Sequence, residues 1–102
     1  MERTIAGKAI TVNEEGFMKD FSQWNEEIAK ELAQENNVEL TPKHWEMIHY
    51  LQEQHKNQVP LTIRKVGNSG IVDIKGFYAL FPVAPLKTAT KIAGIPKPAS
   101  CI

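Results

Sequence analysis

The chain of 102 residues has one cysteine, Cys101, and no long apolar run. A single cysteine cannot close a disulfide within the chain, and a free thiol is typical of a reducing compartment. A membrane-spanning helix requires roughly 20 apolar residues in succession, and no stretch approaches that length. The first residues show no apolar signal region. We therefore expect a cytoplasmic protein that does not cross a membrane.

The chain also has none of the common cofactor and metal motifs: GxGxxG, a P-loop and HExxH are all absent. Its three histidines lie five and six residues apart, at positions His44, His49 and His55. Two metal ligands on one helix face lie three or four residues apart. We therefore expect these histidines at the surface or the edge of the core, and we expect neither a metal nor an organic cofactor.

The net charge is zero, but the two halves of the chain differ in sign. Residues 1–55 carry 5 basic and 11 acidic residues, a net charge of −6, whereas residues 56–102 carry 7 and 1, a net charge of +6. The basic half includes the cysteine. Such an asymmetry can steer an acidic partner or a nucleic acid. For any single lysine, the simpler interpretation is a solvated surface position.

The residue pattern predicts one small α+β domain, with an N-terminal β-hairpin packed on a helical bundle. Short β-prone runs flank a glycine turn in residues 4–12, and a two-stranded hairpin needs helices to pack against. The expected helices cover about 26–36, 42–56, a short stretch after Asp73, and about 85–93. Residues 62–66 fit either a helical turn or a short strand.

Polar residues mark the expected helix starts. Asn25, Thr41 and Asp73 are candidate N-caps, and Pro42 fits a first helical position. The carboxylates Glu26, Glu27 and Glu31 fit a solvated helix face.

Several aromatic residues are expected in the core. Phe17, Phe21 and Trp24 would anchor the segment before the first helix. Five aromatics fall at core-like spacing: Trp24, Trp45, Phe77, Tyr78 and Phe81. We prefer a core role to a base-stacking platform, because no basic residue alternates with these five.

The last nine residues, 94–102, predict an extended, flexible arm after a domain of residues 1–93. Gly94 stops the final helix, and Pro96 and Pro98 favour extended backbone. Seven residue steps from Gly94 to Cys101 reach about 20 Å at ~3.1 Å per residue. An unperturbed thiol has a pKa near ~8.5, so activation of Cys101 is expected in a partner's cleft. The simpler alternative is a terminal thiol without function.

Three C-terminal stretches form a pattern: LFP at 80–82, ATKIAGIPKP at 89–98 and CI at 101–102. This pattern resembles the signature of the DsrC/TusE family of sulfur-relay proteins. Weaker similarity is carried by GF at 16–17, SQW at 22–24 and LTPKHWE at 40–46. Residues 59–76 are shorter and richer in glycine than the family's helix-turn-helix-like middle.

The resemblance implies a sulfur carrier. The family's penultimate cysteine carries sulfur as a persulfide or joins partners covalently, and Cys101 matches it. Members that serve dissimilatory sulfite reductase have a second cysteine where this chain has Thr90, so the chain resembles the single-cysteine TusE branch. The resemblance further implies a donor like the TusBCD complex and delivery toward the thiouridylase that makes 2-thiouridine in tRNA. Arg64 matches a basic residue that the family has near the arm.

We therefore expect a sulfurtransferase-type relay component in which Cys101 accepts and donates sulfur, while Lys97 and Lys91 guide the arm electrostatically. One alternative is a γ-type partner of a sulfite reductase-like enzyme, against which the threonine at position 90 argues. The other is a helix-turn-helix DNA-binding regulator that uses residues 42–56 and 62–80. Neutral net charge argues against that regulator, and direct nucleic-acid binding is not expected.

Overall fold

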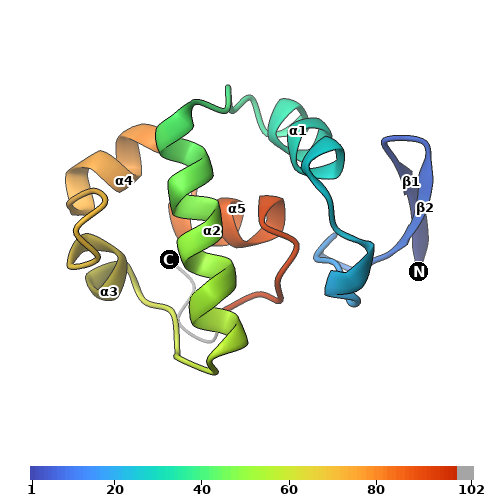
Figure 1. Cartoon of the computed structure of the whole chain (residues 1–102). Helices are drawn as coiled ribbons and strands as arrows, with labels where there is room; N and C mark the ends of the chain where they lie inside the picture. Colours follow the sequence, from blue (N-terminus) through green and yellow to red (C-terminus); the bar gives the residue numbers. More distant parts are fainter. Residues whose placement is uncertain (99–102) are drawn as a thin grey trace.

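The computed structural model describes residues 1–98, so Cys101 lies outside the described residues. The described elements are β1 (Glu2–Ile5), β2 (Lys8–Thr11), the 3-10 helix η1 (Phe21–Gln23), α1 (Glu26–Glu35), α2 (Pro42–Lys56), α3 (Ile63–Gly67), α4 (Ile74–Leu80) and α5 (Pro85–Ile92). Figure 1 shows α2 across the front of α5, with α3 and α4 on one side and the hairpin on the other. The expected α+β class is confirmed, and residues 63–66 turn out to be helical.

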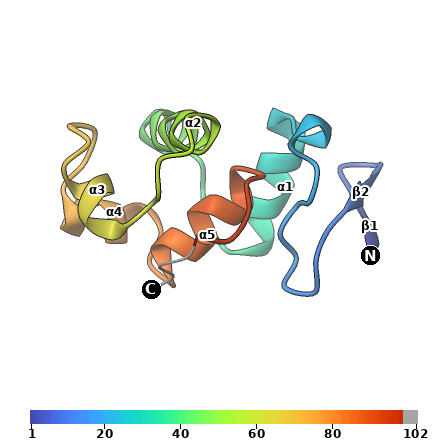
Figure 2. The same cartoon turned by 90° about the horizontal axis from the view of Figure 1, so that it is seen from below.

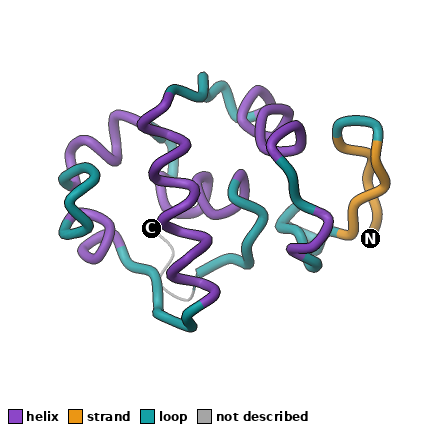
Figure 3. The backbone as a smooth tube through the Cα atoms, viewed as in Figure 1, coloured by secondary structure: helices purple, strands orange, loops and turns teal. Residues whose placement is uncertain are grey.

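Both strands belong to the N-terminal hairpin, as Figure 3 shows. Its turn residues, Ala6 and Gly7, both have positive φ, at 54° and 79°, which suits a two-residue hairpin turn. The Ala6 N–H donates to the Glu31 carboxylate of α1 at 2.6 Å, and Arg3 pairs with Glu35. The hairpin therefore packs on a helix as predicted. The prediction that Glu31 is only a solvated side chain was wrong, because this carboxylate holds the hairpin turn.

The expected N-caps are confirmed. The side chain of Asn25 accepts from the backbone of Ile28, and the side chain of Asp73 accepts from Gly76. Thr41 caps α2 and forms a reciprocal capping box with His44. Each cap satisfies a backbone N–H that the first helical turn leaves without an intrahelical partner.

Helix α5 is at the centre of the bundle and contacts α1, α2 and α4. Figure 2 shows it between α1 on one side and α4 on the other. Leu86, Ala89 and Ile92 of α5 are fully buried in the core. Residues 93–98 therefore follow directly on a helix that is packed in the core. No helix within residues 1–98 is long and apolar enough to cross a bilayer.

Most of the expected core aromatics are buried or partly buried, with two exceptions. Phe17, Phe77 and Phe81 are fully buried. Tyr78 is 40% exposed, so the prediction of a core position was wrong for it. Phe21, expected as an apolar anchor, is 46% exposed, and its ring stacks on that of Trp24 with the ring centres 5.9 Å apart. Tyr78 follows the buried Phe77 on α4, and one helical step turns it about 100° away from the core.

The three histidines lie where the sequence predicted. His44 is buried at the edge of the core, and His49 and His55 are exposed. The His44 Nδ1 accepts from the Thr41 N–H at 3.1 Å, so its Nε2 carries the proton and donates to the Leu80 carbonyl at 2.8 Å. His44 therefore joins the start of α2 to the end of α4.

Candidate functional site: the base of the C-terminal arm

The described part of the predicted arm is residues 94–98, which we call the arm base. Cys101 lies three residues past its end, outside the described residues. The arm base and its contacts define where the thiol-bearing end leaves the domain.

Gly94 ends α5 in a conformation that few other residues could adopt. Its φ is +74°, and a Cβ built on it would lie 2.4 Å from Cδ1 of Trp24. The Trp24 Nε1 donates to the carbonyl of Ile92 at 2.9 Å. Glycine is therefore required twice here, once for the left-handed backbone and once for the close approach of the indole.

The chain remains packed beyond Gly94. The Gly94 N–H donates to the Lys91 carbonyl at 3.1 Å and the Ile95 N–H to the Thr90 carbonyl at 3.2 Å, a Schellman arrangement. Gln52 of α2 donates to the Ala93 carbonyl at 2.9 Å, and Ile95 is 1% exposed. Gly94 and Ile95, which the sequence places in the arm, thus belong to the core. Among the described residues of the predicted arm, exposed positions begin at Pro96.

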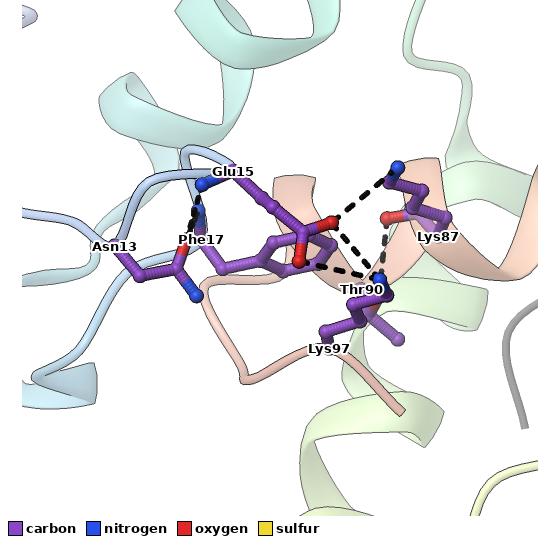
Figure 4. Close-up of polar contacts among 6 residues, drawn as sticks. All are labelled: Asn13, Glu15, Phe17, Lys87, Thr90 and Lys97. Carbon is purple, nitrogen blue, oxygen red and sulfur yellow. Dashed lines mark hydrogen bonds and ion pairs between the residues drawn. The ribbon is translucent and has the colours of Figure 1, made fainter. Parts of the chain in front are cut away.

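Beyond this buried stretch, an ion pair holds Lys97. Its Nζ donates to both carboxylate oxygens of Glu15, at 2.9 and 3.2 Å, and Lys87 Nζ lies 3.5 Å from the same carboxylate (Figure 4). The hydrogen bond from Lys97 holds the pKa of Glu15 below its usual value, and the charges of Lys97 and Lys87 add to the effect. Glu15 is therefore ionised throughout the neutral pH range.

Lys91 lies against the same N-terminal loop. Its Nζ is 5.1 Å from the centre of the buried Phe17 ring, within cation–π range. Burial lowers the pKa of Lys91, and the nearby charge of Lys87 lowers it further. Lys91 and Lys97 are the two lysines predicted to guide the arm. Both contact the loop of residues 13–17, Lys91 through Phe17 and Lys97 through Glu15.

By the sequence resemblance, Thr90 stands where the two-cysteine proteins have their second cysteine. It is fully buried, and its hydroxyl donates to the Leu86 carbonyl at 2.8 Å. The hydrogen-bonding capacity of the Thr90 hydroxyl is therefore met within the helix, and this position supplies no thiol. Arg64 is exposed on α3.

Two hollows flank the arm base, and His55 lines both. One lies along α2 and is lined by Phe21, His49, Gln52, Glu53, His55, Lys56, Asn57 and Ile95. The other is lined by His55, Val59, Pro60, Leu61, Thr62, Pro96, Lys97 and Pro98.

The sequence did not point to Glu15 or Gln52 as residues of this site, and it pointed to Trp24 only as an aromatic anchor of the core. Glu15 contacts Lys97 from 82 positions away, and Trp24 contacts the end of α5 from 68 positions away. In the sequence, nothing distinguishes Gln52 from the other polar residues of the amphipathic helix α2. Only Trp24 carried a signal, since a large aromatic in an irregular segment needs a specific partner.

These observations define a small α+β protein that holds the start of its cysteine-bearing C-terminal end in a fixed place. The family model described as "DsrC like protein" matches residues 4–102, and the chain belongs to this family. Sulfurtransferase TusE of Escherichia coli K12 is 37% identical over 105 residues, covering 94% of this chain and 95% of the relative. The TusE of Salmonella typhimurium is 35% identical over the same shares.

Solved structures give the same fold. DsrC of Allochromatium vinosum superposes with a TM-score of 0.80, and the oxidized γ-subunit of dissimilatory sulfite reductase (DsrC) from Archaeoglobus fulgidus with 0.82. Both are 33% identical and cover 100% of each chain. The predicted hairpin and helical bundle are thus confirmed, and the chain is a sulfur-relay protein of this family.

Proposed function

We propose that the protein is a sulfur carrier that accepts persulfide sulfur on Cys101 and passes it to a protein partner. The observation that carries the proposal is the position of the only thiol. It lies six residues past Ile95, the last fully buried residue of a helix end held by Trp24 and Gln52. A short tether from a fixed point presents a thiol to a partner without unfolding the domain.

The chemistry needs no cofactor and no net redox change. The Cys101 thiolate attacks the terminal sulfur of a donor persulfide, and a new S–S bond forms at Cys101. The S–S bond within the donor breaks, and the donor leaves as a thiolate. An acceptor thiolate then attacks the terminal sulfur on Cys101, takes it, and releases the Cys101 thiolate. One cysteine suffices for both steps.

The likeness to TusE proteins supports a proposal for the partners. We infer a donor like the TusBCD complex and an acceptor that thiolates tRNA, and we place the relay in the cytoplasm, where a lone thiol stays reduced. The γ-subunit likeness supports a second candidate, a partner of a sulfite reductase-like enzyme. Buried Thr90 favours the first, since an internal disulfide or trisulfide needs a second cysteine.

Intact mass spectrometry tests the proposal. The reduced protein is incubated with a sulfur-loaded TusBCD complex and, separately, with glutathione persulfide. The wild type should gain about 32 Da, the mass of one sulfur, and a reducing agent should remove it. Cys101→Ser should gain nothing. An equal gain on the serine variant would place the sulfur elsewhere and refute the assignment.

A further inference from the structure

Glu15 is the residue that ties the arm base to the N-terminal half of the domain. Its carboxylate accepts two hydrogen bonds from the Lys97 Nζ, and it lies beside Lys87. Lys97 is the third residue after Gly94, four positions before Cys101. The contact therefore acts on the chain between the buried helix end and the thiol.

The loop that carries Glu15 is held in a single shape. The side chain of Asn13 accepts from the backbone N–H groups of Glu15 and Phe17, at 2.9 and 3.0 Å (Figure 4). The Asn13 N–H donates to the Phe17 carbonyl at 2.8 Å, and the Phe17 ring is fully buried. Gly16 has a φ of +89° and faces Lys91. The carboxylate thus projects from a preformed turn with a buried anchor.

We propose that Glu15 is a positioning residue for sulfur transfer, which directs the Cys101 arm by holding Lys97 at the surface of the domain. The inference rests on the proposed function and adds a residue to it. A tether that leaves the domain in one direction raises the fraction of encounters in which the thiol meets the partner's reactive sulfur.

The contact is suited to steer the arm without locking it. The Lys97 and Glu15 side chains are 38% and 45% exposed, so water and salt reach the pair. Exposed pairs of this kind are weak and are screened by salt. A partner can therefore displace Lys97 when it draws the arm into its own cleft.

Backbone dynamics test the positioning directly. In the 15N-labelled full-length protein, Glu15→Gln should lower the heteronuclear NOE of Lys97 and of residues 99–102, and wild type in 1 M salt should approach the variant. Glu14→Gln is the matched control, because it removes the same charge from the neighbouring exposed position of the same loop. Unchanged NOE values in Glu15→Gln would overturn the proposal.

Kinetics test whether the positioning serves transfer. With a sulfur-loaded TusBCD complex as donor, Glu15→Gln and Lys97→Gln should each lower kcat/KM about three- to tenfold, mostly through KM. The effects of the two substitutions should be less than additive in the double variant, because the Lys97–Glu15 contact is lost in both single variants. Loading from glutathione persulfide, which needs no docking, should be the same in all variants.

The outcomes separate the possible failures. If Lys97→Gln slows transfer while Glu15→Gln leaves it unchanged or faster, Lys97 binds the partner directly and Glu15 has no positioning role. If wild type takes no sulfur from either donor, the proposed function fails, and the NOE comparison still decides whether Glu15 positions the arm.

Discussion

Replacing Gly94 by alanine is the sharpest structural perturbation that this fold offers. The added Cβ would lie 2.4 Å from Cδ1, 2.8 Å from Cγ and 3.0 Å from Cβ of Trp24. No real Cβ tolerates such distances, so the indole must move. Its Nε1 would then lose the hydrogen bond to the Ile92 carbonyl, and the indole would lose part of its packing against the core.

The expected cost has two parts. A left-handed backbone costs a non-glycine residue about 1 kcal/mol. Displacing Trp24 adds about 1–3 kcal/mol, from a lost hydrogen bond and poorer packing. Gly94→Ala should therefore lower the free energy of unfolding by about 2–4 kcal/mol, measured by urea denaturation with tryptophan fluorescence.

Gly70→Ala is the matched control. Gly70 has a similar φ of +85°, but a Cβ added there would meet nothing within 4 Å. It should therefore show only the backbone cost of about 1 kcal/mol. If both variants lose the same stability, the close approach of Trp24 contributes nothing and the account of a clamped helix end is wrong.

Four further outcomes are expected. His44→Ala leaves the Thr41 N–H and the Leu80 carbonyl without their partner, so it should lower the free energy of unfolding by about 2–3 kcal/mol in urea denaturation. A loss under about 0.5 kcal/mol would contradict this. Deleting residues 97–102 should leave the urea midpoint almost unchanged and abolish sulfur transfer, whereas a large drop would mean that the deleted end is part of the core. Replacing Lys91 and Lys97 by Glu should slow sulfur acceptance from a protein donor several-fold at low salt and much less at high salt. Alkylation of the thiol by a small neutral reagent should be unaffected, and an equal loss of rate in both assays would indicate a change in the thiol pKa instead. The pKa of Glu15 is lowered in the folded protein, so its ion pair with Lys97 should persist at neutral pH and be lost as the pH falls through that lowered value. A two-dimensional NMR titration should therefore show the Lys97 resonances shifting as the pH is lowered from neutral, and resonances that stay in place down to the pH at which the protein unfolds would contradict this.

Local signals in the sequence are enough to predict most of the secondary structure. Asn25, Thr41 and Asp73 cap helices as expected, because a cap depends on residues three or four positions away. Gly94 marks the end of α5 for the same reason. The residue pattern of the short α3 fits both helix and strand, and the cap from Thr62 to the Lys65 N–H shows why it is helical.

The contacts that build the candidate site could not be predicted this way. Glu15 and Lys97 are each ordinary surface residues in sequence, and only the fold brings them together. The periodicity of α1 places Glu31 on a solvated face, because it does not reveal that a hairpin turn covers this carboxylate. The sequence motif located Cys101, whereas the structure shows how residues 94–97 are held.

The central claim, that Cys101 carries sulfur from one protein to another, is tested most directly by a single-turnover chase. The protein is loaded with 35S from a persulfide donor, separated from that donor, and mixed with a tRNA thiouridylase, its tRNA and ATP, which activates the uridine oxygen as the leaving group. We expect the label to leave Cys101 and appear in the thiouridylase and then in the tRNA, with Cys101→Ser carrying none. Label that stays on Cys101 while the acceptor and its tRNA remain unlabelled would contradict the relay.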